Sequence, residues 1–258
     1  MELQKKILDL TVSQVDRVHE RYVLIKLTHN EQLPEIAPGQ FVEIRVDGSP
    51  QTFLRRPISI HFVDYERNEL WLLVAIVGKG TQQMAKLKAG DTLNCVLPLG
   101  NFFHCSFFED KPLLVGGGVG VAPLLFAGKE FCVGKTKPTF LLGARSSKDL
   151  LQLDEFRKYG RVFVTTEDGS AGEKGFVTQH TVLQQEEFDH IFVCGPTPMM
   201  KAVARYAREH NIPCHVSLEN MMACGLGACL CCVEKTKWGN LRVCEDGPVF
   251  DIKELLWE

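Results

Sequence analysis

The sequence predicts a multidomain protein in which an antiparallel β-barrel precedes an α/β domain with a parallel sheet, and a small cysteine-rich domain follows. Three observations lead to this prediction. Short β-branched or aromatic runs separated by turns fill the first part of the chain, and from about residue 111 apolar runs alternate with helix-length segments. Four thiols then lie close together between Cys224 and Cys232. The expected domains are residues 1–106, 107–212 and 213–258.

The first domain contains four runs that are typical of antiparallel strands. Each is rich in β-branched, leucine or aromatic side chains and is bounded by turn residues. Only residues 81–88 have a helical pattern. A series of short strands of this kind indicates a barrel or a sandwich. The runs are residues 22–28, 40–46, 57–63 and 70–77.

The second domain has apolar strands separated by segments long enough for helices. This alternation is typical of a parallel sheet covered by helices. The predicted strands are residues 113–117, 139–144, 161–168 and 190–195.

The third domain begins where the alternation stops, after Ile212. It is rich in glycine and cysteine and then contains a predicted hairpin of residues 232–237 and 240–244, turning at Trp238 and Gly239. Four of its cysteines have the spacing C-x4-C-x2-C-x11-C, which matches the plant-type ferredoxin pattern for a [2Fe–2S] cluster except for a shorter last interval. These cysteines are Cys224, Cys229, Cys232 and Cys244.

The residues between the cysteines support the same interpretation. Gly225 and Gly227 are expected to adopt positive φ and to let backbone amides point at sulfur. Cys231 and Cys232 are neighbours, and neighbours in extended backbone point to opposite sides, so only one is expected to face the cluster. A shifted ligand set that includes Cys231 stays open. A structural zinc is the alternative, but zinc sites usually pair their cysteines as two separated C-x2-C units.

Composition limits the possible partners. A formal net charge of −3 provides no basic face for phosphate backbones, so no nucleic-acid partner is expected. The N-terminal lysines precede no apolar core of signal-peptide length, and the most apolar run, residues 112–128, is short for a membrane span and interrupted by glycines. We therefore expect a cytoplasmic protein with no membrane partner. Its ten cysteines should remain reduced, and reduced thiols in a tight cluster indicate metal or redox chemistry.

Two features of the first domain fit a diphosphate. Arg55 and Arg56 precede Ser59 at the head of a strand, where a guanidinium fork and a hydroxyl can bind phosphate. By itself, a solvated arginine pair at a strand edge is the simpler interpretation. Gly80 and Thr81 open the one predicted helix of this domain, and free amides at a helix N-terminus form an anion site.

The second domain contains a glycine run that fits a dinucleotide pyrophosphate. It follows a predicted strand and opens a helix, although its spacing is not GxGxxG, and a glycine-rich turn without a ligand is the alternative. Cys194 ends a later strand at the same carboxyl edge, where it could touch a nicotinamide or be a buried small thiol. The glycines are Gly116, Gly117, Gly118 and Gly120.

The choice between NAD and NADP stays open from the residues themselves. Asp168 follows one strand and would favour NAD, whereas Arg145 follows another and would favour a 2′-phosphate.

The combination of motifs resembles the ferredoxin reductase superfamily and, within it, the family of electron-transfer subunits of NAD-dependent bacterial dihydroorotate dehydrogenases. The resemblance covers nearly the whole chain, and the run SLENMMACGLGACLCCV at residues 217–233 is its most specific part. The other motifs that carry it are Arg56-Pro-Ile-Ser59, Gly80-Thr81, Pro98-Leu-Gly100-Asn, the triple glycine at residues 116–118 and Cys194-Gly-Pro.

The resemblance implies an FAD-binding barrel, an NAD-binding domain and a [2Fe–2S] tail, in that order. It implies an oxidoreductase subunit of pyrimidine biosynthesis that passes electrons from an FMN-containing dihydroorotate dehydrogenase catalytic subunit through the cluster and FAD to NAD⁺. It also implies a heterotetramer with two copies of each subunit. The chain is too short to hold an FMN barrel besides its own three domains, so it would need this partner to oxidise dihydroorotate.

The resemblance assigns three segments to the FAD site: the flavin motif, a strand segment that lies along the flavin, and the turn that binds the diphosphate. No role is assigned to Glu219 or His215, which are expected to be turn residues. The residues carried over are Arg56, Pro57, Ile58, Ser59, Leu73, Val74, Ala75, Gly80 and Thr81.

Two alternatives remain. The chain could be the small subunit of an NADH-dependent ferredoxin:NADP oxidoreductase or of a sulfide dehydrogenase, which are built from the same modules. From a different class, it could be a zinc-stabilised binding module with a vestigial nucleotide fold.

Overall fold

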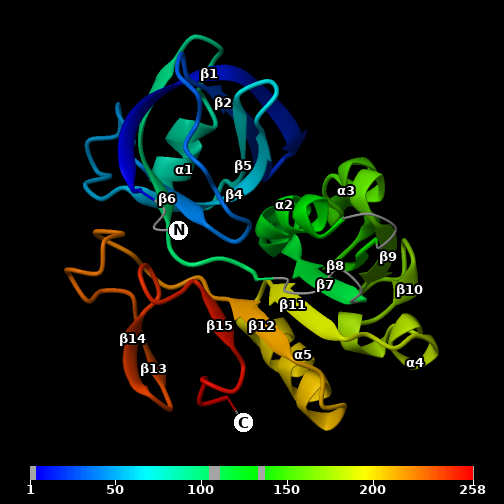
Figure 1. Cartoon of the computed structure of the whole chain (residues 1–258). Coiled ribbons are helices and arrows are strands. Elements are labelled where there is room, and N and C mark those ends of the chain that lie inside the picture. The colour runs from blue at the N-terminus through cyan, green and yellow to red at the C-terminus, as the bar shows by residue number, and fades with distance from the viewer. Residues whose placement is uncertain (1–3, 105–110, 133–136, 258) are drawn as a thin grey trace.

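The computed structural model describes residues 4–104, 111–132 and 137–257. A barrel from the N-terminal part of the chain packs against an α/β layer, and the C-terminal tail returns beside both (Figure 1). No helix within these residues is long and apolar enough to cross a membrane.

The N-terminal part is a closed six-stranded antiparallel barrel in the order β1-β2-β5-β4-β3-β6. Closure gives every strand two neighbours, so no strand is a free edge along its whole length. The predicted helix is present as α1 (Lys79–Met84), which begins earlier and ends earlier than expected. The strands are β1 (Lys6–His19), β2 (Tyr22–Thr28), β3 (Phe41–Ile44), β4 (Arg56–Asp64), β5 (Glu69–Ala75) and β6 (Thr92–Leu99).

Two of these strands, β1 and β6, were not identified from the sequence. In β1 only Leu10 and Val12 are buried, and two register shifts interrupt its pairing with β2. The alternation of apolar and polar side chains is therefore weak in this strand, although it pairs with both β2 and β6.

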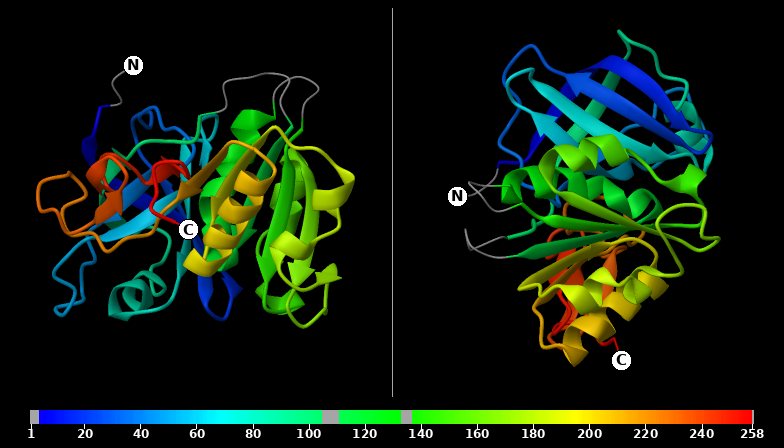
Figure 2. Two further views of the ribbon diagram at one scale, coloured as in Figure 1. Left: turned by 90° about the horizontal axis from the view of Figure 1, so that it is seen from below. Right: turned by 90° about the vertical axis from the view of Figure 1, so that its right-hand side faces the viewer.

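The α/β part has a seven-stranded sheet in the order β10-β9-β8-β7-β11-β12-β15, in which only β15 is antiparallel to its neighbour. Helices α2 and α3 lie on the face toward the barrel, and α4 and α5 lie on the opposite face (Figure 2). The strands are β7 (Pro112–Gly117), β8 (Thr139–Ala144), β9 (Arg161–Thr166), β10 (Glu173–Lys174), β11 (His190–Cys194), β12 (Cys214–Ser217) and β15 (Val249–Asp251). The helices are α2 (Ala122–Phe131), α3 (Leu153–Tyr159), α4 (Val182–Gln185) and α5 (Thr197–Glu209), with 3₁₀ turns η1 (Gly118–Val121), η2 (Ser147–Asp149) and η3 (Val177–Gln179).

The sheet continues beyond Ile212, where the sequence pattern suggested that it stops. Strand β12 is parallel to β11, and β15 from the end of the chain adds to β12. Both strands are short, and the pairing of β15 joins distant parts of the chain, so neither has a clear local signal. The tail therefore shares backbone hydrogen bonds with the α/β sheet.

The remainder of the tail is a cysteine-containing loop followed by a hairpin. Strands β13 (Val233–Thr236) and β14 (Gly239–Arg242) confirm the predicted hairpin, and pairing of Thr236 with Gly239 places the turn one residue earlier than expected.

The barrel and the α/β part are joined by polar contacts as well as by apolar packing. The imidazole of buried His61 on β4 hydrogen-bonds through Nδ1 to the carbonyl oxygen of Ala122, at 2.8 Å. Lys129 on α2 donates from Nζ to the carbonyl oxygen of Val63, at 2.9 Å. Burial lowers the pKa of His61 to about 4, so the imidazole is neutral at physiological pH.

Candidate functional site

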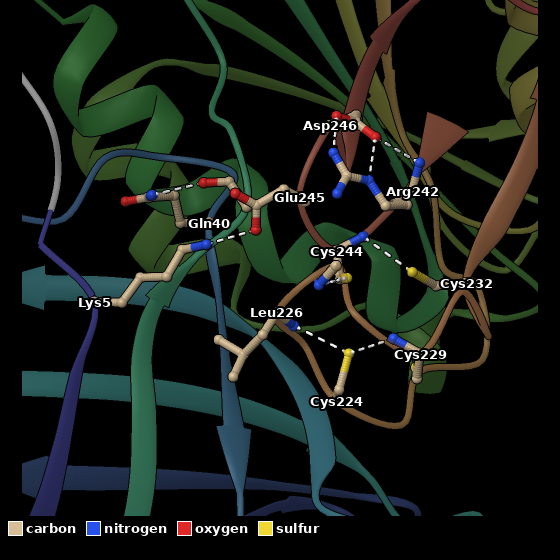
Figure 3. Close-up of polar contacts among 12 residues, drawn as sticks. Lys5, Gln40, Cys224, Leu226, Cys229, Cys232, Arg242, Cys244, Glu245 and Asp246 are labelled. Carbon is tan, nitrogen blue, oxygen red and sulfur yellow. Dashed lines mark hydrogen bonds and ion pairs between the residues drawn. The ribbon is translucent and has the colours of Figure 1, made fainter. Parts of the chain in front are cut away.

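The loop of residues 220–232, here called the cysteine loop, directs backbone amides at thiol sulfur atoms (Figure 3). The amides of Leu226 and Cys229 lie 3.4 and 3.5 Å from Cys224 Sγ. The amide of Gly227 lies 3.2 Å from Cys244 Sγ, and the amide of Cys244 lies 3.4 Å from Cys232 Sγ. Amide donors aimed at sulfur are the surroundings that a thiolate-bound cluster needs.

The backbone conformation of the loop confirms the expectation for its glycines. Gly225 and Gly227 have φ of +66° and +75°. Both conformations are in the left-handed region, which side chains with a Cβ rarely adopt.

The thiols differ in their readiness to ionise. Burial acts to raise the pKa of Cys224, but the amides of Leu226, Cys229 and Ala228 and the Cys229 thiol outweigh it and lower the pKa to about 6. The pKa of Cys244 is raised to about 12, first by burial and then by the neighbouring thiol of Cys232. Cys224 is thus a thiolate near neutral pH, the form that binds metal.

Of the two neighbouring cysteines, Cys232 is buried and Cys231 is exposed, as is the predicted ligand Cys229. The residue types and the amide donors fit an iron–sulfur cluster. Within the part of the chain that the structure describes, however, no three Cys, His, Asp or Glu side chains already converge as metal ligands. The assignment of Cys224, Cys229, Cys232 and Cys244 as ligands stays a prediction.

In the barrel, Arg55 and Arg56 have different surroundings. Arg55 donates to the carbonyl oxygens of Asn94 at 2.9 Å and Glu43 at 3.3 Å and to the Asn94 side chain, so it is tied into the barrel wall. Arg56 instead lines a cavity of about 370 Å³ together with Gly80 and the turn before α1. Arg56 is therefore the arginine that can reach an anion.

The turn before α1 is shaped closely around this cavity. A Cβ on Gly80 would lie 3.2 Å from Arg56 Cδ and from Thr52 Cγ2, so the glycine leaves the space that a phosphate would need. The Thr81 hydroxyl accepts from the amides of Val77 at 2.9 Å and Gly78 at 3.1 Å. Thr81 thus holds the turn through its side chain. These features fit a bound diphosphate.

The other predicted flavin residues lie outside this cavity, at the end of the barrel where β4 and β5 are not paired. Pairing of β4 with β5 extends from Asp64 only to Ile60. Beyond it, Pro57, Ile58 and Ser59 pair with β3, while Leu73, Val74 and Ala75 pair with β2.

The glycine run lines a larger cavity, of about 930 Å³, to which all three parts of the chain contribute. Gly117, Gly118 and Gly120 line it, whereas Gly116 is buried in β7. A Cβ on Gly120 would lie 2.4 Å from Gly195 Cα, so the two loops meet backbone to backbone. The barrel contributes Tyr22, the tail contributes Glu219, and the cavity fits a dinucleotide in size and position.

Cys194 does not line this cavity. Its thiol is fully buried, and its pKa is well above the usual range, first because of burial and then because of the nearby Glu219 carboxylate. Glu219, expected to be a turn residue, lines the cavity. Desolvation by the surrounding protein raises the pKa of its carboxyl group. The signal for Glu219 would have been its position just after the parallel strand β12, which the sequence pattern did not reveal.

His215 also differs from the expectation of a turn residue. It lies in β12, and its Nδ1 is 2.7 Å from His190 Nε2 on β11. Neither histidine lines the two cavities.

Asp168 does not line the nucleotide cavity, whereas Glu167, the residue before it, does. The Asp168 carboxylate accepts hydrogen bonds from the amide and hydroxyl of Ser170, at 2.9 and 2.6 Å. Glu167 and Arg145 both line the cavity, at the carboxyl ends of β9 and β8.

Three family models match successive parts of the chain. Residues 10–104 match the oxidoreductase FAD-binding domain, and residues 114–205 match the oxidoreductase NAD-binding domain. Residues 219–256 match the iron–sulfur cluster binding domain of dihydroorotate dehydrogenase B. The order of the three modules agrees with the order expected from the sequence.

Curated relatives match over nearly their full length. The chain is 40% identical over 253 residues to the electron transfer subunit of dihydroorotate dehydrogenase B (NAD(+)) from Fusobacterium nucleatum, covering 95% of this chain and 96% of the relative. It is 41% identical over 225 residues to the protein of the same name from Caldanaerobacter subterraneus, covering 85% and 87%.

Solved structures share the fold. A structure of NADH-dependent reduced ferredoxin-NADP oxidoreductase superposes with a TM-score of 0.85 at 33% identity, covering 96% of this chain and 90% of that one. The ferredoxin reductase of carbazole 1,9a-dioxygenase superposes with a TM-score of 0.71 at 19% identity, covering 84% and 70%, and shows the fold alone.

Proposed function

Since this chain belongs to the family of dihydroorotate dehydrogenase B electron transfer subunits, we propose that its three sites form one path, on which electrons enter at the cysteine loop, cross the barrel and leave on NAD⁺. The chain is an oxidoreductase subunit with FAD-binding, NAD-binding and iron–sulfur domains, and it acts with a catalytic partner in pyrimidine biosynthesis. When bound, the cluster supplies one-electron transfer and FAD links it to hydride exchange with nicotinamide.

The observation that carries this proposal is the contact between the cysteine loop and the barrel. Gly225 lies against Glu43 of β3, and Glu43 pairs with Pro57 of the flavin motif on β4. Buried Cys232 and Cys244 belong to the same apolar cluster as Phe41 of β3. The cysteine loop, which contains predicted cluster ligands, therefore packs on β3, and β3 pairs with the strand that carries the predicted flavin motif.

The residues of each site are proposed to bind and position rather than to exchange protons. Arg56 and the amides of Gly80 and Thr81 would hold the diphosphate of FAD, while Gly117 to Gly120 leave room for the nucleotide pyrophosphate. Cys194 would support the glycine run from beneath. We propose the domain limits 1–106, 107–212 and 213–258 as functional units.

The partner is proposed to carry FMN and to assemble with this chain as two copies of each subunit in the cytoplasm. The support is the family's name, which implies a catalytic subunit. Light scattering of the copurified complex and its FMN content test the stoichiometry.

The similarity to NADH-dependent ferredoxin-NADP oxidoreductase favours a second candidate function, as the small subunit of such an enzyme. The higher identity to the dihydroorotate dehydrogenase subunits favours the first. The matches to FAD-binding, NAD-binding and iron–sulfur domains do not support a zinc-stabilised binding module.

Coexpression of the chain with the FMN-containing catalytic subunit from the same genome tests the proposal. The complex is expected to reduce NAD⁺ with dihydroorotate, while the catalytic subunit alone does not. A chain that instead copurifies with a partner carrying further iron–sulfur clusters and a second flavin, and that does not couple dihydroorotate to NAD⁺, would support the second candidate.

A further inference from the structure

A buried carboxyl group lies between the flavin motif and the cysteine loop. Glu43 is in the middle of β3, where Val42 and Ile44 point into the barrel core and Phe41 packs against the tail. Glu43 therefore lies on the outer side of the barrel, yet it is fully buried because the cysteine loop covers it.

The covering contact is close. A Cβ on Gly225 would lie 2.7 Å from Glu43 Cγ and 3.2 Å from Glu43 Oε1, so the backbone next to Cys224 rests directly on this side chain. Among the described residues, neither carboxylate oxygen of Glu43 has a hydrogen-bond partner. An unpaired polar group in such a place is unfavourable for folding.

The charges around Glu43 come from the two arginines beside the flavin motif and from the cysteine loop. Arg56 and Arg55 lie on the flavin side and act to lower its pKa, while Cys224 on the loop side acts to raise it. Burial is the largest effect and brings the pKa to about 7. Because the carboxyl group is buried, water screens its charge less than it would at the surface.

We propose that Glu43 is a positioning residue that sets the reduction potential of the iron–sulfur cluster relative to that of the flavin. The inference rests on the proposed function, because it requires a cluster in the cysteine loop. Cluster potentials depend on nearby charge, burial and hydrogen bonds to sulfur. A carboxylate under the loop opposes the arrival of a further electron at the cluster and so lowers its potential.

The effect is unequal at the two sites. The guanidinium groups of Arg55 and Arg56 act on Glu43 from the flavin side and the Cys224 sulfur acts on it from the loop side, so the arginines would offset the carboxylate more at the flavin than at the cluster. Glu43 thus makes the reduced cluster a stronger donor toward the flavin. In a transfer of one electron from the cluster to the flavin, Glu43 would act through its charge and would not itself carry the electron.

The test is the midpoint potential of the cluster, followed by low-temperature paramagnetic resonance during an anaerobic redox titration at about pH 8.5, above the pKa of about 7. Glu43→Gln keeps the shape and removes the charge, Glu43→Asp keeps the charge, and Glu66→Gln is a matched control at an exposed position of the barrel. We expect a positive shift of the cluster potential in Glu43→Gln, a smaller shift in Glu43→Asp and none in Glu66→Gln.

Iron and flavin contents separate the two ways in which the test can fail. Wild-type protein that contains no cluster would contradict the proposed function itself. A full iron content with an unshifted potential in Glu43→Gln would overturn only the role of Glu43. Glu43→Met fills a similar volume without charge, so loss of iron from both Glu43→Gln and Glu43→Met would make the carboxyl an assembly determinant and would also overturn this inference.

Discussion

The two neighbouring arginines of the flavin motif provide the sharpest prediction about the barrel. Arg56 lines the 370 Å³ cavity, whereas Arg55 is bound to Asn94 and to the carbonyl oxygen of Glu43. Arg56→Ala should therefore weaken FAD binding, and Arg55→Ala should instead destabilise the barrel.

The structure allows both magnitudes to be estimated. A hydrogen bond to a charged group contributes about 1.5–3 kcal/mol, and about 1.4 kcal/mol corresponds to tenfold in affinity. Loss of one contact from Arg56 to the diphosphate should thus raise the dissociation constant of FAD by about 10- to 150-fold. Loss of the Arg55 contacts should lower the free energy of unfolding by about 1–3 kcal/mol, because part-buried acceptors then lose their donor.

Titration of the flavin-free protein with FAD, followed by flavin fluorescence, gives the dissociation constants, and urea unfolding gives the stabilities. Arg56→Lys is a useful third variant, because it keeps the charge but loses the fork geometry. Wild-type affinity for FAD in Arg56→Ala, or a specific loss of affinity in Arg55→Ala at unchanged stability, would refute the reasoning.

Three further predictions concern the other parts of the molecule. Cys229→Ser should abolish electron exchange with the partner in either direction but spare NADH oxidation with an artificial two-electron acceptor, because the nucleotide and flavin sites lie in other domains. Loss of both activities with FAD still bound would argue against this order of carriers. Gly120→Ala would place a Cβ 2.4 Å from Gly195 Cα and should weaken NADH binding by about tenfold or more in a direct titration, so an unchanged affinity would remove this loop from the site. Because the pKa of His61 is about 4 in the folded protein and 6.5 in the unfolded chain, the unfolded chain binds more protons and stability should fall as the pH drops from about 6.5 to 4. Between pH 7 and 4.5 the resulting loss of unfolding free energy is about 2 kcal/mol. Urea unfolding should show that this loss is missing in His61→Gln and retained in the control His210→Gln. Equal pH dependence of stability in both variants would contradict the assignment.

The features that the sequence revealed are local in the chain. The cysteine spacing and the glycines of the cysteine loop depend on the conformation of a few consecutive residues, as φ of +66° at Gly225 shows. The glycine run, which ends β7 and continues into η1, is similarly a strand-to-helix turn whose residue types follow from close backbone approach.

The features that the sequence did not reveal depend on distant contacts. Strand β15 pairs with β12, which lies more than 30 residues earlier in the chain. Glu219 lines the nucleotide cavity because β12 ends beside it. In the sequence, Glu43 is an ordinary polar residue of an alternating strand. In the structure, Gly225 covers its side chain. Single side chains of this kind carry no periodic signal, so only the folded structure shows their surroundings.

The most direct test of the account is an iron count and a paramagnetic resonance spectrum of the anaerobically purified chain after reduction with dithionite. The account predicts about two irons per chain and the low-temperature signal of a reduced [2Fe–2S] centre, lost on substitution of Cys224. A colourless protein that contains zinc and gives no such signal would contradict it.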